Sequence, residues 1–488
     1  MSQDIRNLEP KALWNKFADL NAVPRPSKKE GRVIQFMKDF GNSLGLETFE
    51  DEIRNVIIRK PATKGMENCK TIVLQGHLDM VHQKNNDTTF DFLTQGIDMY
   101  VDGDWIRARG TTLGADNGLG VAAIMAILES KDIPHPAIEA LFTIDEETGM
   151  TGALNLKGGI LKGEILLNLD TEEDDEIDIG CAGGIDVTAT RTYNEEEVPE
   201  GSVGYTITVK GLNGGHSGMD IHKGLGNANK IMNRLLFDGF ENFGLQIAEI
   251  SGGSLRNAIP RESVAKVIVA GMYDEAFVFD MQEIINDIKF EFKTTEPNLI
   301  IEIVKSDLQS KVMDLGVQEA LLRAIYTAHN GVYRMSADMD DLVETSNNIA
   351  RVVVAAGEIS IQNLTRSSIE SSKIDLANGL RSAYELFGCE VEFGGSYPGW
   401  TPNVKSEILD VLTSIYENQN SEKPKVVACH AGLECGILGT NYPEMDMISF
   451  GPTIHGAHSP DERASIKSSQ KFWKFFLEIL ANIPVKTN

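Results

Sequence analysis

Residues 71–79 read TIVLQGHLD, an apolar run that ends in a histidine and, two residues later, an aspartate. A short apolar run of this kind is typical of a strand buried inside a parallel sheet. Two runs of the same style follow at 138–144 (IEALFTI) and 164–169 (EILLNL), after a helical segment at 120–128 (GVAAIMAIL). Helices that alternate with short buried strands predict an α/β fold whose mostly parallel central sheet is flanked by helices.

The pattern changes near residue 185. Strand-like segments there alternate apolar and polar residues, as in VGYTITVKG at 203–211, and helical segments lie between them. This order recurs without a clear sequence repeat, and the first style returns from about residue 400. We therefore expect a discontinuous first domain, 1–184 with 400–488, and an inserted α+β domain, 185–399, built of two similar halves.

The composition argues against two classes of partner. The 488 residues carry a formal net charge of −27, which repels both nucleic acid and anionic membranes. The five cysteines are scattered and form no C-x-x-C pair, so we expect a reducing compartment and a cytoplasmic protein. The N-terminal residues lack the apolar run of a signal peptide, and no stretch of about 18 apolar residues occurs.

Four groups of acidic residues and histidine follow predicted strands or glycine turns, where open α/β sheets place their sites. Each group alone has an ordinary structural explanation. His77-Leu-Asp79 also fits a polar strand end, Asp116 in GADNG fits a helix N-cap, and Asp145-Glu146-Glu147 fits a solvated acidic loop. The fourth is Asp170 in NLD, followed by an acidic run at 172–176 that we interpret as solvated surface.

A fifth element lies near the C-terminus, in GPTIHGAHSPDERASI at 451–466. His458 would join the other groups if both chain ends form one domain, and His455 competes with it for that role. Together, the groups offer nitrogen and oxygen ligands and no sulfur. This mixture suits zinc, manganese or cobalt.

Seven motifs occur in the order seen in the aminoacylase/carboxypeptidase/carnosinase superfamily of dinuclear metallopeptidases, which the chain resembles nearly end to end. It is most similar to the aminoacyl-histidine (Xaa-His) dipeptidases. The motifs are GHLDMV (76–81), GADNG (114–118), DEETGMTGA (145–153), NLDTEE (168–173), GGHSG (214–218), RNAIP (256–260) and HGAHSPDE (455–462).

The resemblance implies two divalent cations, with zinc preferred and manganese or cobalt possible. Asp116 would bridge both ions; His77 and Asp170 would complete one site, and Glu147 and His458 the other. Asp79 would orient His77, and Glu146 would be the general base. The resemblance also implies a cis peptide between Asp116 and Asn117, a catalytic domain formed by both chain ends, and a lid and dimerisation domain at 185–399.

Substrate-binding residues are expected in the inserted domain and near GLECG (432–436). By resemblance, His216 would stabilise the oxyanion, reaching into the partner subunit of a homodimer. Asn257 would assist the oxyanion or the substrate, and Gly432 would offer its N–H to the substrate carboxylate. Arg366 would pair with the same carboxylate, since arginine binds carboxylates through two parallel hydrogen bonds. Arg256 and Arg334 remain rivals for that role.

The predicted function is hydrolysis of Xaa-His and related, carnosine-like dipeptides, with the small dipeptide as the partner molecule. An aminoacylase, a deacetylase or a tripeptidase of the same superfamily would have the same metal site. A non-catalytic metal-binding protein is the third possibility, against which Glu146 stands as a base beside a full ligand set.

Overall fold

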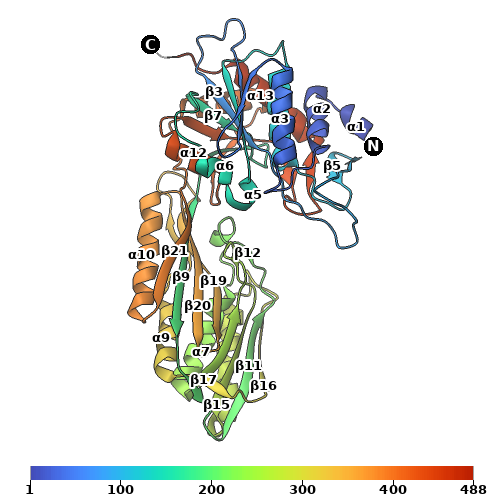
Figure 1. Ribbon diagram of the computed structural model, residues 1–488. Coiled ribbons are helices and arrows are strands. Elements are labelled where there is room, and N and C mark those ends of the chain that lie inside the picture. The colour runs from blue at the N-terminus through green and yellow to red at the C-terminus, as the bar shows by residue number, and fades with distance from the viewer. Residues whose placement is uncertain (1, 487–488) are drawn as a thin grey trace. The chain divides into compact units, whose positions relative to one another are not determined.

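The computed structural model describes residues 2–486. The chain divides into two compact units. Unit 1 comprises 1–180, 400–428 and 433–488, so the blue and red ends of the chain build it together (Figure 1). Unit 2 comprises 181–399 and 429–432. The last four residues of unit 2 had been placed with the C-terminal segment in the sequence analysis. None of the described helices has the length and apolar character needed to cross a membrane.

Unit 1 is built on an eight-stranded sheet with the order β1-β2-β6-β3-β7-β23-β8-β22. The four central strands, from β6 to β23, are parallel, and β1, β2 and β8 pair antiparallel with their neighbours. The predicted mostly parallel sheet is therefore confirmed. The strands are β1 Glu47–Glu50, β2 Val56–Lys60, β3 Ile72–His77, β6 Ile138–Thr143, β7 Ile165–Asn168, β8 Glu176–Cys181, β22 Lys425–Cys429 and β23 Asp446–Ser449.

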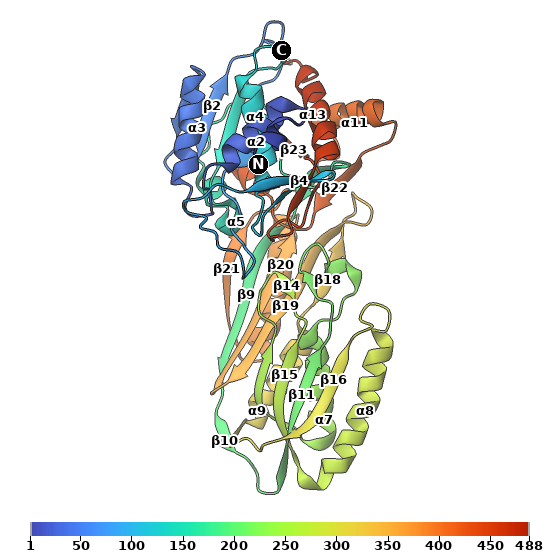
Figure 2. The same ribbon diagram turned by 90° about the vertical axis from the view of Figure 1, so that its right-hand side faces the viewer.

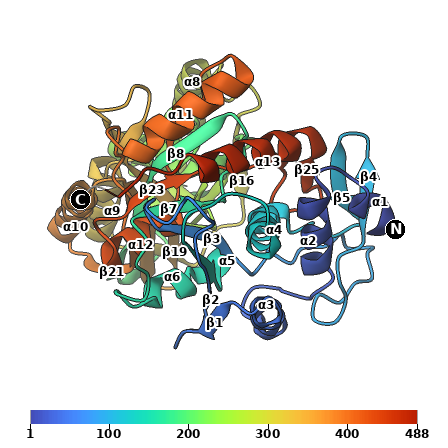
Figure 3. The ribbon, with the colours of Figure 1, turned by 90° about the horizontal axis from the view of Figure 1, so that it is seen from above.

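Helices flank this sheet, as predicted. α4 is buried along nearly its whole length and contacts both β3 and α2, while α11 and α13 run side by side (Figure 3). A small sheet, β24-β25-β5-β4, completes the unit. The helices are α1 Ser2–Arg6, α2 Lys11–Asn21, α3 Gly31–Ser43, α4 Ala115–Glu129, α5 Glu146–Gly149, α6 Thr151–Asn155, α11 Glu407–Asn420, α12 Glu434–Asn441 and α13 Ile466–Ala481; the strands are β4 Met99–Asp102, β5 Trp105–Ala108, β24 Ile454–His455 and β25 Arg463–Ser465.

Unit 2 contains an antiparallel sheet with the order β16-β11-β15-β13-β19-β20-β9-β21, and β18 pairs with β19 (Figure 2). Its two halves repeat one strand order, β13-β15-β11-β16 and β19-β20-β9-β21, and they meet where β13 pairs with β19. The predicted two similar halves are confirmed. The strands are β9 Gly183–Thr192, β11 Ser202–Lys210, β13 Gln246–Gly252, β15 Ser263–Ala270, β16 Ile300–Ser306, β18 Gly331–Met335, β19 Val343–Ala355, β20 Glu358–Ser367 and β21 Glu390–Tyr397.

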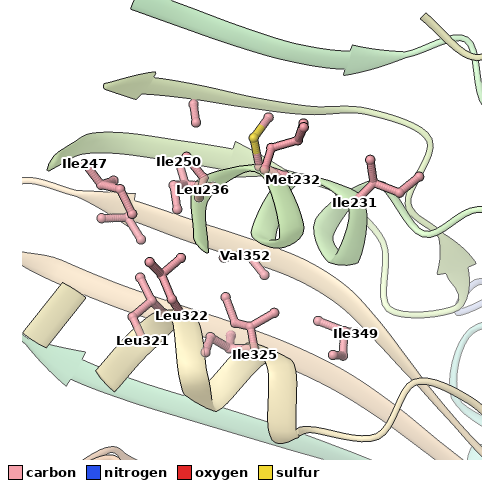
Figure 4. Packing of buried hydrophobic residues seen from close by; sticks show 14 of the residues in the cluster. Ile231, Met232, Leu236, Ile247, Ile250, Leu321, Leu322, Ile325, Ile349 and Val352 are labelled. Atoms are coloured by element: carbon pink, nitrogen blue, oxygen red, sulfur yellow. The ribbon is translucent and has the colours of Figure 1, made fainter. Parts of the chain in front are cut away.

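Each half places two helices against the sheet, in the order strand, helix, strand, strand, helix, strand. Strands such as β15 alternate buried and exposed side chains along part of their length, as expected where one sheet face is covered. Apolar side chains of α7 and α9, including Met232, Leu236 and Leu322, pack with Ile250 and Val352 of the sheet (Figure 4). The helices are α7 Ala228–Phe243, α8 Asp274–Glu291, α9 Leu315–Thr327 and α10 Glu370–Leu386.

Candidate metal centre and active site

The ends of three parallel strands bring the acidic groups of unit 1 together. His77 is the last residue of β3, and its register partner Thr143 ends β6, two residues before Asp145. Asp170 follows β7 by two residues on the other side of β3. Because the carboxyl ends of parallel strands meet at one edge of a sheet, these residues share one site.

Asp116 lies between two imidazoles. Its Oδ1 is 3.1 Å from His77 Nε2, and its Oδ2 is 3.2 Å from His458 Nε2. His77 Nε2 is also 3.5 Å from Asp170 Oδ1, and His458 Nε2 is 3.0 Å from Glu147 Oε2. The peptide bond between Asp116 and Asn117 is cis, which confirms that expectation.

These contacts define two ligand groups that share Asp116: one with His77 and Asp170, the other with Glu147 and His458. Within each group the potential ligand atoms lie within 4.8 Å of one another. Asp170 Oδ1 is buried and accepts no hydrogen bond, and His77 Nε2 beside it is 3.5 Å away, longer than a normal hydrogen bond. The nitrogen and oxygen donors and this unpaired oxygen fit two divalent cations.

A third group of carboxylates, Glu30, Asp79 and Asp145, is also close enough to hold an ion. Its members already accept hydrogen bonds from the protein. Glu30 accepts from the N–H of Lys28 (2.7 Å), Asp79 from the N–H groups of Glu146 (3.0 Å) and Glu147 (3.3 Å), and Asp145 from the hydroxyls of Thr148 and Thr151. Asp79 Oδ1 also lies 3.5 Å from His77 Nδ1, beside the ring it was expected to orient.

The electrostatics of the centre favour protonated imidazoles when no cation is bound. Asp116 and Glu147 raise the pKa of His458 to about 11. Burial lowers the pKa of His77, but Asp170, Asp116 and Asp79 outweigh burial and hold it well above its ordinary value. Burial raises the pKa of Glu146 well above its ordinary value, because the ionised form is poorly solvated there.

Uptake of metal ions by the metal-free protein is expected to release about two protons at neutral pH, one from each imidazole, because a ligand histidine must be neutral. The apparent affinity should therefore rise with pH, by about tenfold per pH unit for each proton displaced. Calorimetric titration with zinc in buffers of different ionisation enthalpy measures the number of protons released. Release of no protons would contradict the assignment of both histidines.

Glu462 is a functional residue that the sequence analysis missed. Its carboxylate accepts hydrogen bonds from four consecutive backbone N–H groups, and it is 2% exposed. It therefore ties the loop that carries His458 to the turn that carries Asp116. The donors are Leu113 (2.6 Å), Gly114 (2.9 Å), Ala115 (2.7 Å) and Asp116 (3.3 Å).

The turn around Gly114 also packs tightly against a buried cation. Arg25 donates to the carbonyls of Leu78 (3.2 Å), Asp79 (2.9 Å) and Gly114 (2.5 Å). Gly114 has φ +67, and a Cβ there would lie 2.6 Å from Arg25 Nη2. A residue without a side chain is required here, because both the positive φ and the close approach exclude a Cβ.

Substitution of Glu462 by glutamine is expected to lower the free energy of unfolding of unit 1 by about 2–4 kcal/mol, since the amide N–H₂ leaves backbone donors unpaired. Metal affinity should fall by about 10–100-fold, because Asp116 and His458 lose their support. Asp461→Asn, at the exposed neighbouring residue, is the matched control and should change neither quantity. Denaturant unfolding and chelator competition measure both. An affinity loss in Asp461→Asn as large as in Glu462→Gln would refute this role.

In unit 2, His216, Ser217, Arg366 and Tyr397 form one polar cluster. Arg366 donates from Nε to Ser217 Oγ (3.3 Å) and from Nη1 to Tyr397 Oη (2.9 Å), and its Nη2 is 3.4 Å from His216 Nε2. Arg366 is 4% exposed. The rivals are placed differently: Arg256 is engaged by Asp186 (3.2 Å), and Arg334 is exposed beside Glu344.

His216 is held as a neutral ring with a defined tautomer. Its Nδ1 accepts from the N–H groups of Gly218 (3.2 Å) and Met219 (3.1 Å), so the ring proton lies on Nε2. Burial, reinforced by Arg366, lowers the pKa of His216 to about 4. Two donors, His216 Nε2–H and Arg366 Nη2, therefore lie close together, an arrangement that suits an anionic oxygen.

Asn257 contacts this cluster, and Gly432 belongs to the same unit. His216 pairs with Ala258 across β12 (Gly215–His216) and β14 (Ala258–Ile259), and Asn257 accepts from the N–H of Ser217 (2.8 Å) through its carbonyl. Asn257 is exposed, and Gly432 is half-buried before α12. His430, which the sequence analysis missed, is buried with its Nε2 2.8 Å from Ser346 Oγ.

Two interpretations near the centre need correction. The run 172–176 is half-buried rather than solvated, and burial together with Asp116 and Asp170 raises the pKa of Glu172 to about 8. His455, the rival of His458, instead lies 3.2 Å from Glu173 and packs against Trp105. Contacts with residues far away in the chain, such as Lys425 with Asp175 and Lys471 with Asp174, partly cover this run although its local sequence is strongly polar.

Comparison with known proteins gives matches over most of the chain. The model of peptidase family M20/M25/M40 matches residues 73–482. The cytosol non-specific dipeptidase of Escherichia coli (strain K12) is 42% identical over 488 residues, covering 99% of this chain and 100% of that protein. The aminoacylhistidine dipeptidase of Vibrio alginolyticus is 42% identical, with a TM-score of 0.93 and full coverage of both chains. Aminopeptidase PepT of Bacillus cereus, 17% identical with a TM-score of 0.57, shares the fold and covers 97% of this chain and 98% of its own.

Proposed function

This chain belongs to peptidase family M20/M25/M40, and from that membership we propose that it is a dinuclear metal-dependent dipeptidase that hydrolyses Xaa-His and related dipeptides. The relatives that match it over their whole length are described as a cytosol non-specific dipeptidase and an aminoacylhistidine dipeptidase. The observation that carries the proposal is the position of Asp116, whose two carboxylate oxygens face two different imidazoles.

In this proposal Asp116 bridges two divalent cations, His77 and Asp170 complete one site, and Glu147 and His458 complete the other. The unpaired Asp170 Oδ1 and the two ligand groups support it. When bound, such ions would lower the pKa of a shared water and polarise the scissile carbonyl. We propose zinc as the native ion, a choice that the nitrogen and oxygen ligands permit but do not enforce.

Glu146 acts as the general base. It takes a proton from the attacking water and returns it to the leaving amine of the dipeptide. Its neighbour Glu147 faces His458, so the two adjacent carboxylates serve different purposes. Asp79 receives the N–H groups of both residues and lies beside His77, and it therefore positions the base and the ligands together.

Residues of unit 2 bind the substrate. His216 donates its Nε2–H to the oxygen that becomes negative during attack. Arg366 pairs with the terminal carboxylate of the dipeptide, and Asn257 and Gly432 supply further donors. The neutral ring of His216 and the two closely spaced donors support these roles. We further propose a cytoplasmic homodimer, with unit 2 as its lid and dimerisation domain.

A substrate panel tests this function against its alternatives. The protein, stripped of metal and reloaded with zinc, manganese or cobalt, is assayed with β-Ala-His, Gly-His, Leu-Gly, tripeptides and N-acetyl amino acids. The proposal predicts metal-dependent turnover that is fastest with the dipeptides. Preference for N-acetyl amino acids would identify an aminoacylase or deacetylase, preference for tripeptides a tripeptidase, and absence of all turnover in the metal-loaded protein a non-catalytic metal-binding protein.

A further inference from the structure

A continuous chain of buried side chains crosses the sheet of unit 1 just before the proposed metal ligands. It contains one residue from each of five neighbouring strands, β6, β3, β7, β23 and β8. Each of these side chains is at most 5% exposed, so the protein itself must satisfy their hydrogen bonds. In the order of the strands, they are Thr143, Gln75, Asn168, Ser449 and Asp178.

One end of this hydrogen-bond chain is Glu434, the first residue of α12. Glu434 Oε2 accepts from Gln75 Nε2 (2.6 Å) and from the hydroxyl of Thr143 (2.6 Å). Gln75 Oε1 in turn accepts from Asn168 Nδ2 (2.5 Å). Gln75 and Asn168 lie two residues before His77 and Asp170, so these amides fix the two strand ends that carry ligands.

At the other end of the hydrogen-bond chain, the oxygen–oxygen contacts outnumber the hydroxyl hydrogens that could fill them. Ser449 Oγ lies 2.5 Å from Asn168 Oδ1, Thr171 Oγ1 lies 2.8 Å from Ser449 Oγ, and Thr171 Oγ1 lies 2.8 Å from Asp178 Oδ2. These are three oxygen–oxygen contacts, but the two hydroxyl groups carry only two hydrogens between them. With the amides oriented as they are, a third hydrogen must come from the carboxyl group of Asp178.

The proton would have to lie on Glu434 instead if both amides were turned and the chain ran in the opposite direction. Hydrogen bonding favours the first arrangement, because Glu434 Oε2 accepts two hydrogen bonds that stabilise its ionised form, whereas Asp178 Oδ2 contacts one hydroxyl, that of Thr171. The charged side chain that acts on Asp178 is Glu176 of the same strand, itself paired with Lys425 of β22 (3.6 Å), while β23 faces Asp178 with the uncharged Ser449. Burial raises the pKa of Asp178 and that of Glu434 alike, each to about 7, so the hydrogen bonds and not burial distinguish the two carboxyl groups.

We propose that Asp178 is a positioning residue: as a neutral carboxylic acid it donates to Thr171 and completes a directed hydrogen-bond chain that holds the strand ends bearing His77 and Asp170. The effect on metal binding rests on the proposed ligands, whereas the protonation of Asp178 does not. When Asp178 ionises, Thr171 turns its hydroxyl toward the carboxylate, and the contact between Thr171 and Ser449 loses its hydrogen. The hydrogen-bond chain is then broken between Ser449 of β23 and Thr171.

Infrared difference spectra of the metal-free protein test the protonation directly. The spectrum of the wild type minus that of Asp178→Asn at pH 6 should contain the carbonyl band of a protonated, buried carboxyl, and this band should give way to carboxylate absorption as pH rises through about 7. Asp175→Asn, which changes a half-buried carboxylate paired with Lys425 on the same segment, should show no such band. A carboxylate signal for Asp178 already at pH 6 would overturn the proposal, irrespective of the zinc affinities of the variants.

Chelator competition for zinc tests the positioning role. Asp178→Asn keeps a neutral donor, so its affinity should match the wild type within about twofold below pH 7 and exceed it at higher pH. Thr171→Val and Asp178→Leu break the chain and should bind zinc about 10–100-fold more weakly at every pH. If Asp178→Leu does not fold, the zinc affinity of Thr171→Val alone tests the positioning role. Wild-type affinity in Thr171→Val, or identical pH profiles for the wild type and Asp178→Asn, would exclude the role.

Discussion

Glu146→Gln is expected to retain both metal ions and to lose about 10²–10⁴-fold in kcat, because a glutamine cannot accept the proton of the attacking water. The change affects a half-buried side chain that forms no ion pair with the two imidazoles, whose partners are Asp116, Asp170, Glu147 and Asp79. The pH–rate profile of the residual activity should also lose its acid limb, the fall in rate toward low pH. Burial raises the pKa of Glu146, so in the wild type the fraction of ionised base falls as pH decreases through that raised value.

The neighbouring residue provides a matched control. Glu147→Gln makes the same carboxylate-to-amide change at the adjacent residue, but Glu147 Oε2 lies 3.0 Å from His458 Nε2. This variant should lose one of the two ions, whereas Glu146→Gln should lose none. Metal analysis after gel filtration and initial rates on a dipeptide measure the two properties. Full activity in Glu146→Gln would refute the mechanism, and equal metal loss in both variants would refute the separation of roles.

Asp116→Ala is expected to weaken both metal sites at once and to reduce kcat/KM by at least about 10³-fold, since several kcal/mol of charge stabilisation are lost. The reason is geometric: one carboxylate offers Oδ1 to the group of His77 and Oδ2 to the group of His458. His458→Ala removes a ligand from one group and should leave the other ion bound. The metal content of the two variants, titrated with zinc, distinguishes a bridging residue from an ordinary ligand. One firmly bound ion in Asp116→Ala would contradict the bridge.

Residues at strand ends were predictable because the signal is local. An apolar run that stops at His77, Glu146 or Asp170 marks both the strand and the polar residue that follows it, and parallel strands place such residues at one edge of the sheet. His458 needed the family resemblance as well, because nothing in its own loop indicates which part of the chain it contacts. The resemblance to a known family also carried the assignment of the bridge to Asp116.

Residues that support the centre from a distance were not predictable in this way. Glu462 follows His458 by four residues in a motif that had been recognised, but its partners are backbone N–H groups 346 or more residues away in the chain. Glu434 lies within GLECG, where substrate-binding residues were expected but a supporting carboxylate was not, and it is the first residue of α12. Burial of a carboxylate depends on what packs over it, and a single sequence does not contain that information.

Ser27 and Glu30 show how a long-range contact can override a local pattern. Their spacing suggests a capping box at the start of α3. In the structure Glu30 is itself the N-cap residue, and the hydroxyl of Ser27 donates to the carbonyl of Met80 at 3.1 Å. Pro26 pairs with Met80 in an isolated bridge, and this pairing draws Ser27 away from the helix. The helix Gly31–Ser43 therefore begins without the reciprocal hydrogen bonds of a capping box.

Anomalous diffraction from crystals of the zinc-loaded protein is the most direct measurement of the central claim. We predict two peaks about 3.5–4 Å apart, one beside His77 and Asp170 and the other beside Glu147 and His458, with the carboxylate of Asp116 between them. A single peak, or a peak at Glu30, Asp79 and Asp145 in place of this pair, would contradict the claim that both ends of the chain hold two cations around Asp116.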